Sequence, residues 1–229
     1  MAIDGPAGAG KSTLARRIAD KLGFIYVDTG AMYRSVALWA LRNGTDPGDM
    51  HRLEQLAREA RIEFAPGTRT VLLNGEDVSD AIRAPEVGDA ASKVSAIPGV
   101  RRALVARQRE MAENASVVME GRDIGTVVFP DATVKFYMDA ESQVRAERRV
   151  QELAAAGEEV SREIVAQGLQ ERDKRDRTRA HSPLAQAPDA VYLDTSGLTI
   201  DEVEVAMLKT IRERTSNGKE LARGKEHKR

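Results

Sequence analysis

Eight residues near the start of the chain have the pattern of a phosphate-binding loop. The run Gly5-Pro6-Ala7-Gly8-Ala9-Gly10-Lys11-Ser12 fits G-x-x-x-x-G-K-[ST] at every fixed position. Its glycines allow backbone N–H groups to turn inward around phosphate oxygens, and the helix expected to follow adds its positive N-terminal end. Lys11 can then reach the β- and γ-phosphates of a nucleoside triphosphate, and the Ser12 hydroxyl can bind Mg²⁺. A chance glycine-rich turn is the alternative, but a predicted strand and an amphipathic helix flank the run as the motif requires.

A second polar cluster follows the next predicted strand, Ile25–Val27. It is the run Asp28-Thr29-Gly30-Ala31-Met32-Tyr33-Arg34. The carboxyl ends of strands in an open parallel sheet face the ligand crevice, so we expect this cluster there. Thr29 can cap the helix that begins near Gly30 or contact a ligand. Tyr33 can pack on a base or sugar, or in the core.

A third cluster, Glu120-Gly121-Arg122-Asp123-Ile124-Gly125-Thr126, follows the predicted strand Ser116–Met119. Arg122 and Asp123 can form a structural ion pair with each other. Their position beside a glycine turn at the crevice instead favours a role in binding phosphate or the phosphoryl acceptor.

The densest group of charges lies in Glu171–Arg179. On a helix Arg172, Arg175, Asp176 and Arg179 share one stripe. Such a run is usually a solvated face, but four arginines within eight residues repel one another unless an anion neutralises them. A phosphoryl group in transfer is such an anion. Three further arginines on the preceding predicted helix can close over the same phosphates: Arg145, Arg148 and Arg149.

Apolar periodicity predicts alternating strands and helices, which indicates an α/β fold with a parallel sheet covered on both faces. Strands are expected at Ala2–Asp4, Ile25–Val27, Ser116–Met119, Val134–Met138 and Val191–Leu193. Helices are expected at Lys11–Lys21, Gly30–Arg42, Glu141–Ala156, Arg162–Arg177 and Thr199–Arg212. Only four residues precede the phosphate-binding loop, so the first strand is expected to be clipped.

One stretch, about residues 52–95, breaks the alternation and is predicted to be an insert with a small antiparallel sheet. Its short strands are expected at Arg61–Phe64, Thr70–Leu73 and Glu76–Val78, with a hairpin turn at Asn74-Gly75. Helices are expected to follow at Glu86–Ser95 and Pro98–Asn114. The polar tail 215–229 is predicted to be disordered.

Composition excludes several classes of protein. The 229 residues include no cysteine, which excludes disulfides, thiolate metal sites and cysteine nucleophiles, and the three histidines lie far apart. The net charge of −1 gives no bulk attraction to nucleic acid or membrane. No apolar run approaches a membrane span and no leader is evident, so we expect a cytoplasmic protein. Without a heptad pattern or a large apolar face, we expect a monomer.

The position of the other motifs indicates a kinase of small molecules rather than a switch GTPase. Asp194-Thr195-Ser196-Gly197 fits D-x-x-G, but it lies near the C-terminus and N-K-x-D is absent. None of the clusters contains an obvious general base. That suits phosphoryl transfer, which depends on positioning and charge neutralisation.

Taken together, the clusters resemble those of the bacterial cytidylate kinases, from the phosphate-binding loop to about Thr195. The resemblance rests on these segments: Gly5–Thr13, Asp28–Arg34, Gly75–Ser79 with Ile82-Arg83, Ala90–Ser92, Pro98 with Val100-Arg101, Gln108-Arg109, Gly121–Ala132, Glu171–Arg179 and Ser182–Leu184. It implies in-line phosphoryl transfer from ATP, with Mg²⁺, to CMP and dCMP. It also implies a P-loop core formed by residues 1–51 and 96–214, a lid at about 145–180 and an NMP-binding insert at 52–95.

The resemblance further implies roles for individual residues. ATP is expected at Gly5, Pro6, Ala7, Gly8, Ala9, Gly10, Lys11, Ser12, Thr13 and Arg148, with Ser12 on the metal. CMP is expected at Thr29, Tyr33, Arg34, Ser92, Arg101, Gly121, Arg122, Asp123, Arg172, Asp176 and Arg179. The expected catalytic residues are Lys11, Arg122, Arg172, Arg175 and Arg179.

Within the CMP set, Ser92, Arg101 and Asp123 should face the base and Asp176 the ribose. Asp123 can accept a hydrogen bond from the exocyclic amine of cytosine. Uracil would instead place its O4, which is also an acceptor, against the Asp123 carboxylate. Asp176 makes no demand for the 2′-hydroxyl, which would allow deoxyribose.

Two alternatives stay open from the sequence. One is another small-molecule kinase, for UMP, shikimate or gluconate. The other is a nucleic-acid-binding NTPase that uses the arginine clusters, against which stand the net charge and an aromatic content of only 4%.

Overall fold

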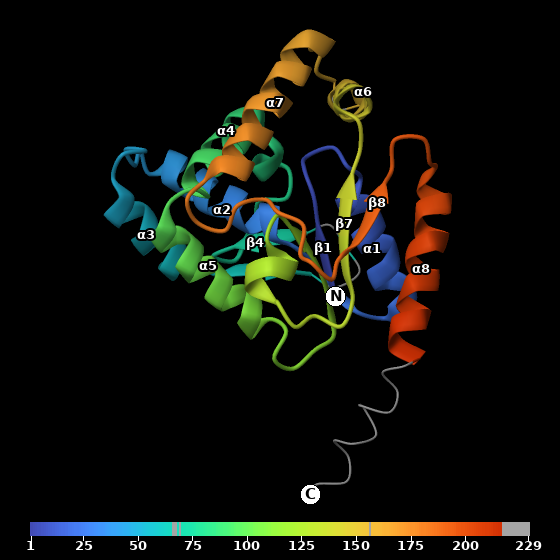
Figure 1. Cartoon of the computed structure of the whole chain (residues 1–229). Helices are drawn as coiled ribbons and strands as arrows, with labels where there is room; N and C mark the ends of the chain where they lie inside the picture. The colour runs from blue at the N-terminus through green and yellow to red at the C-terminus, as the bar shows by residue number, and fades with distance from the viewer. Residues whose placement is uncertain (66–67, 69, 156, 217–229) are drawn as a thin grey trace, which may run out of the picture.

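The main sheet has five parallel strands in the order β2-β6-β1-β7-β8, as the sequence predicted for an α/β fold (Figure 1). The structure is a computed structural model that describes residues 1–65, 68, 70–155 and 157–216. The strands are β1 (Ala2–Asp4), β2 (Ile25–Asp28), β6 (Val117–Gly121), β7 (Lys135–Asp139) and β8 (Val191–Asp194). Although β1 has only three residues, it pairs along its whole length with β6 and β7.

Side chains alternate across the sheet and build two apolar clusters, one on each face. Ile3, Val118 and Phe136 pack on one face with α1 (Lys11–Leu22) and α8 (Ile200–Ser216). On the other face Ala2, Val27 and Met119 belong to the cluster that also holds α2 (Thr29–Arg42), α4 (Pro85–Val94) and α5 (Pro98–Glu110). The predicted cover on both faces is therefore confirmed, and α1 ends at Gly23 in the left-handed conformation expected of its cap.

The insert contains the predicted antiparallel sheet, in the order β3-β4-β5. Its strands are β3 (Ile62–Phe64), β4 (Val71–Leu73) and β5 (Glu76–Asp77), followed by a short 3₁₀-helix η1 (Ala81–Arg83). Asn74 and Gly75 have φ of 53° and 87°, which confirms the hairpin turn. Val71 and Leu73 join the same apolar cluster as the main sheet, so this small sheet shares a core with the rest of the chain.

Besides η1, two elements were not predicted. Helix α3 (Met50–Glu59) lies inside the stretch expected to be an antiparallel insert, where Leu53, Leu56 and Ala57 form a helical stripe that packs in the core. A π-helical turn, η2 (Ile124–Val128), follows β6. The stripe in α3 was a readable signal, whereas nothing in the local sequence indicates the π-helical turn.

Helices α6 (Ser142–Ala155) and α7 (Arg162–Thr178) pack together beyond the carboxyl end of β7 (Figure 1). Arg179 ends α7 as its C-cap and is not part of the helix. Helix α8 continues to Ser216, past the predicted end at Arg212, and the remaining predicted tail, 217–229, lies outside the described residues. None of the helices in the described part of the chain combines the length and apolar character that crossing a bilayer requires.

Glu204 of α8 forms ion pairs with α1, and its replacement should destabilise the fold. Its carboxylate is buried and pairs with Arg17 and Lys21 of α1. Both cations are partly exposed and would hydrate in Glu204→Ala. We therefore expect a loss of only about 1 kcal/mol, or roughly 2–4 °C in Tm. Thermal unfolding beside the exposed control Glu213→Ala tests this, and equal Tm values for the two variants would contradict it.

Candidate active site

The phosphate-binding loop joins the end of β1 to the start of α1, and its shape depends on glycine. Gly5, Gly8 and Gly10 have φ of 147°, 77° and 87°, all in the left-handed range. A Cβ atom on Gly5 would lie 1.9 Å from the carbonyl oxygen of Met138 in β7, so no other residue fits there.

Neighbouring side chains hold the carbonyl groups of this loop. Arg145 Nη1 donates to the oxygen of Ala7 at 3.1 Å, and Thr195 Oγ1 donates to that of Ala9 at 3.2 Å. Lys11 Nζ donates to the oxygen of Pro6 at 2.6 Å. These contacts fix the shape of the loop. Its backbone N–H groups can then bind an anion.

The three arginines of α6, which the sequence predicts can close over the phosphates, are engaged by groups of the protein in this structure. Arg145 is buried and forms an ion pair with Asp173 of α7 at 2.7 Å. Arg148 donates to the carbonyl oxygen of Thr195 at 2.6 Å, and Arg149 pairs with Glu152 of its own helix. These positively charged groups therefore brace α6, α7 and the residues beside the loop.

A cavity of about 180 Å³ opens beside Lys11 and Ser12 at the carboxyl ends of β2 and β6. All the residues that the sequence assigned to CMP line it: Thr29, Tyr33, Arg34, Ser92, Arg101, Gly121, Arg122, Asp123, Arg172, Asp176 and Arg179. The cavity is also lined by five residues that the sequence did not assign: Asp28, Gly30, Ala91, Ser95 and Glu120. Arg148 and Arg175 lie outside the lining, so the structure does not bring them to this cavity.

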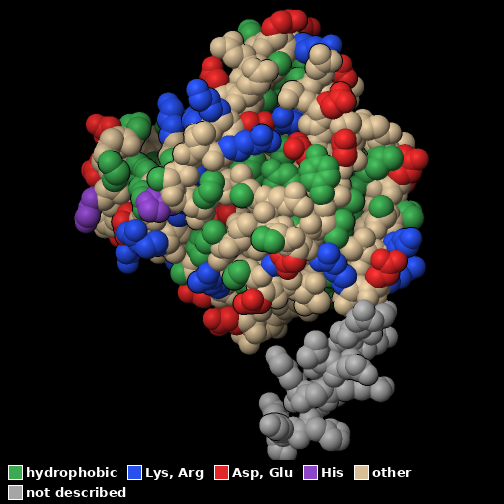
Figure 2. Space-filling view, viewed as in Figure 1, with side chains coloured by type: hydrophobic (Ala, Val, Ile, Leu, Met, Phe, Trp, Pro, Cys, Tyr) green, Lys and Arg blue, Asp and Glu red, His purple; other side chains and the backbone are tan. Residues whose placement is uncertain are grey.

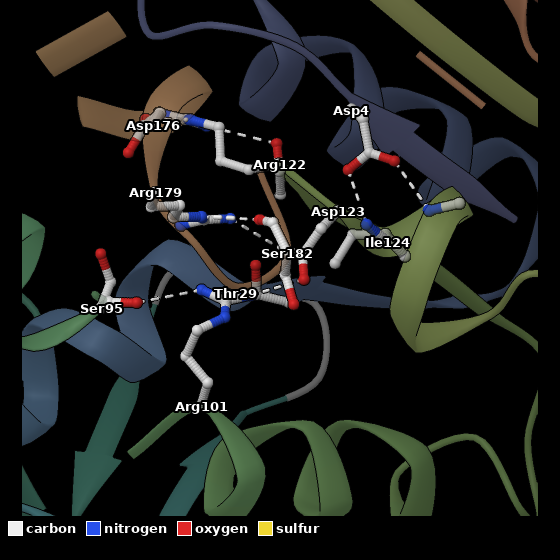
Figure 3. Close-up of polar contacts among 12 residues, drawn as sticks. Asp4, Thr29, Ser95, Arg101, Arg122, Asp123, Ile124, Asp176, Arg179 and Ser182 are labelled. Atoms are coloured by element: carbon white, nitrogen blue, oxygen red, sulfur yellow. Dashed lines mark hydrogen bonds and ion pairs between the residues drawn. The ribbon is translucent and has the colours of Figure 1, made fainter. Parts of the chain in front are cut away.

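Arginine–aspartate pairs cross the cavity and link segments far apart in the chain (Figure 3). Asp123 accepts from Arg101 at 2.5 Å and lies 3.5 Å from Arg179, while Arg122 pairs with Asp176 at 2.9 Å. The sequence alone predicts that an outside anion neutralises the arginines around α7. Carboxylates of the protein supply much of that neutralisation instead, and Figure 2 shows basic and acidic side chains gathered together below α7.

Two positive charges in the lining have no carboxylate partner among the described residues. Arg172 takes part in no ion pair there, and burial followed by the charge of Arg122 lowers its pKa to about 10. Burial and then the charge of Arg122 also lower the pKa of Lys11 to about 7. Burial is the larger cause of both shifts, but the contribution of Arg122 reflects positive charges that lie close together in this region of the cavity, which favours an anion.

Several polar groups in the cavity have the geometry of ligand contacts. The hydroxyl groups of Ser92 and Tyr33 are buried without a hydrogen-bond partner among the described residues. The guanidinium carbon of Arg101 lies 5.5 Å from the centre of the Tyr33 ring. Thr29 does not cap α2, because the Asp28 carboxylate accepts from Ala31 N–H in that role, and the Thr29 hydroxyl donates to the Glu120 carbonyl at 2.7 Å.

Asp4 holds the turn that carries Arg122 and Asp123, a role that the sequence analysis missed. Its two carboxylate oxygens accept from the backbone N–H groups of Ile124 at 2.8 Å and Gly125 at 2.7 Å (Figure 3). Burial raises the pKa of Asp4 to about 6. Because Asp4 directly precedes Gly5, one residue connects the phosphate-binding loop with the acceptor side of the cavity.

Glu120 belongs to the third polar cluster of the sequence, where it was given no role of its own. Four carboxylates line the cavity, and three of them pair with arginine: Asp28, Asp123 and Asp176. Glu120 has no arginine or lysine partner in the part of the chain that the structure describes. Burial and then the negative charge of Asp28 raise its pKa. Its place at the end of the strand beside β1 is where P-loop proteins carry a metal-binding acid, which was a readable signal.

Binding of a nucleoside triphosphate should take up a proton at Lys11. At about pH 8.5 a lysine of pKa near 7 is neutral, and phosphate oxygens should restore its charge. The affinity should therefore fall as the pH rises above about 7. Calorimetry at about pH 8.5, in buffers of different ionisation enthalpy, should detect close to one proton taken up by the wild type and none by Lys11→Met. Equal uptake by both proteins would contradict this assignment.

Comparison with known proteins identifies the family. The profile of the family described as cytidylate kinase matches residues 1–213. A cytidylate kinase of Solibacter usitatus is 61% identical over 97% of this chain and 96% of its own length. One of Syntrophotalea carbinolica is 50% identical over 93% of this chain and 92% of its own.

A solved structure gives independent support for the fold alone. It is an uncharacterized protein from Eubacterium ventriosum, with a TM-score of 0.51 and 11% identity, covering 92% of this chain and 96% of its own. The whole-length match to the family does not favour a kinase of shikimate, gluconate or another unrelated acceptor. The chain belongs to the cytidylate kinase family and is a nucleoside monophosphate kinase.

Proposed function

We propose that this kinase transfers the γ-phosphoryl group of ATP to CMP and dCMP within the cavity beside Lys11 and Ser12. One observation carries the proposal: the residues that sequence motifs assigned to the acceptor come from five separate segments and line this single cavity. The phosphate-binding loop opens at the same place. Donor and acceptor would thus meet without water between them, as direct transfer requires.

The phosphates should lie toward the two unpaired positive charges. Lys11 would stabilise the charge that moves from the γ-phosphoryl group during transfer, and Arg172 would bind the acceptor phosphate. Arg122 and Arg179 can turn from their aspartate partners toward the same phosphate. Arg175 and Arg148 remain predicted contacts of the nucleotides, and they can reach them only if α6 and α7 move.

The nucleoside should lie toward Ser92, Arg101 and Asp123. The closer contact of Asp123 is with Arg101, through Oδ2, while Oδ1 is 3.5 Å from Arg179 and can accept from the cytosine amine. The unpartnered Ser92 hydroxyl can donate to N3 or O2 of the base. Uracil would set its O4 against Asp123, at a cost of about 1–3 kcal/mol. Asp176 remains the predicted contact of the ribose.

The donor set fits Mg²⁺ accompanying ATP. Ser12 and Glu120 both line the cavity, and Glu120 is the lining carboxylate that no arginine neutralises. The described residues contain no group of three or more side chains able to hold a metal by themselves. This suits an ion that takes most of its ligands from phosphate and water. When bound, Mg²⁺ would neutralise charge on the phosphates, and Ser12 and Glu120 would orient it.

The domain division proposed for this function follows the sequence analysis. Residues 145–180 form the lid and residues 52–95 the NMP-binding insert. Two ion pairs support the assignment of the lid, because they join it to the core across the cavity. They are Asp176 with Arg122 and Arg179 with Asp123. A monomeric state, a cytoplasmic location and the absence of nucleic-acid binding remain predictions from composition.

A coupled assay with ATP and each of CMP, dCMP, UMP and AMP tests the acceptor. We expect kcat/KM for CMP and dCMP to exceed that for UMP by at least about tenfold, the effect of one mismatched hydrogen bond. AMP should be a poor substrate. Equal use of UMP and CMP would overturn the base contacts proposed here.

Asp123→Asn should weaken the choice between CMP and UMP. An amide can present a donor to O4 of uracil where the carboxylate can only accept. The ratio of the kcat/KM values for CMP and UMP should fall about tenfold or more. The control is Asp80→Asn, since Asp80 is exposed and its side chain caps no backbone group. An unchanged ratio, at any residual activity, would make Asp123 a scaffold and leave Ser92 and Arg101 as the residues that recognise the base.

A further inference from the structure

The Glu120 carboxylate is held from the side away from the cavity. Tyr26 of β2 donates its phenol O–H to Glu120 Oε1 at 2.5 Å. We propose that Tyr26 is a positioning residue that aims the other oxygen of Glu120 at the metal-nucleotide site beside Ser12. This inference rests on the proposed role of Glu120 toward Mg²⁺.

The sheet places Tyr26 where it can do this. In the parallel ladder of β2 and β6, Tyr26 pairs with Val118 and Asp28 with Glu120. Tyr26 and Glu120 are therefore two positions apart on the same face, the face that α1 covers. The phosphate-binding helix lies directly over this pair.

Two further contacts restrain Tyr26 and Glu120. The guanidinium carbon of Arg16, on α1, lies 5.1 Å from the centre of the Tyr26 ring, which restrains the ring. The main chain of Glu120 is fixed separately, because its carbonyl accepts from the Thr29 hydroxyl at 2.7 Å. A carboxylate at the end of a glutamate turns freely about its last bond unless a partner holds it. The hydrogen bond from Tyr26 restrains this rotation on the side of the carboxylate away from the cavity, and Ser12 of the phosphate-binding loop interacts with the same carboxylate.

Tyr26 does not itself touch the reacting groups. It is absent from the lining of the cavity that holds Lys11, Ser12 and Glu120. It lines a neighbouring hollow of about 370 Å³ with Arg16 and Phe24, and this hollow shares Asp28 and Arg34 with the cavity. The direct contact of the Tyr26 hydroxyl on the cavity side is its hydrogen bond to Glu120, so we expect its effect on the metal to pass through that carboxylate.

The test is Tyr26→Phe, which removes the hydroxyl and keeps the ring against Arg16. Calorimetry should give a Kd for ATP with Mg²⁺ that is about three- to tenfold higher than in the wild type, the effect of one misaligned ligand. The Kd for ATP in EDTA should change less than twofold. In turnover, the Mg²⁺ concentration for half-maximal rate should rise about three- to tenfold, with KM for CMP unchanged. The matched control is Tyr192→Phe, whose ring is about half exposed on β8.

One further variant, Glu120→Gln, separates this inference from the proposed metal site. If Glu120→Gln binds ATP with Mg²⁺ as the wild type does, the metal role of Glu120 is wrong and the inference falls with it. If Glu120→Gln weakens that binding but Tyr26→Phe does not, the metal site stands and only the inference is overturned.

The double variant decides whether Tyr26 acts through Glu120. In the Glu120→Gln background, Tyr26→Phe should have no further effect on the Kd for ATP with Mg²⁺. A further loss of the same size would mean that Tyr26 supports the fold and not the carboxylate. Loss of ATP affinity in EDTA as well as in Mg²⁺ would overturn the inference in the same way.

Discussion

The site depends on buried arginines whose charge is balanced by aspartates from other segments. Arg101, Arg122 and Arg179 would repel one another in the cavity. Asp176 pairs with Arg122, and Asp123 is shared by Arg101 and Arg179, so the two aspartates neutralise most of this charge. A buried pair of this kind costs desolvation, and breaking it by removing one partner costs more. Among the lining residues that the structure describes, Lys11 and Arg172 are the cations without a carboxylate partner in an ion pair, and these two places favour phosphate.

This balance of charge requires that the segments carrying the arginines and aspartates keep fixed positions relative to one another. Strand β1 holds two of these segments in place. Its last residue, Asp4, binds the turn after β6, and the next residue, Gly5, begins the phosphate-binding loop. The loop and the acceptor turn are therefore fixed to one point of the sheet. The shapes of both subsites therefore depend on the same two backbone hydrogen bonds to Asp4, a carboxylate whose pKa is raised to about 6.

Sequence patterns predicted the parts of the site that follow a strand or a motif. Tyr33 and Asp123 were found because polar residues at the carboxyl ends of parallel strands meet at one crevice. The pairing of Asp123 with both Arg101 and Arg179 could not be predicted, because it depends on three segments folded against one another. The π-helical turn is a tertiary effect of the same kind. By contrast, the metal-facing position proposed for Glu120 and helix α3 could both have been predicted, the first from a carboxylate at the end of a strand and the second from an apolar stripe.

The charge pairs also suggest how a phosphate on the acceptor prepares its own binding site. A phosphate dianion competes with Asp123 and Asp176 for Arg179 and Arg122, because it carries more charge than a carboxylate and has three oxygens that can accept from the two guanidinium groups. Each arginine drawn to phosphate frees a carboxylate oxygen. Those oxygens, on Asp123 and Asp176, are the acceptors proposed for the cytosine amine and the ribose. One exchange would then create both the phosphate donors and the nucleoside acceptors, and a nucleoside without phosphate would find the carboxylates still occupied.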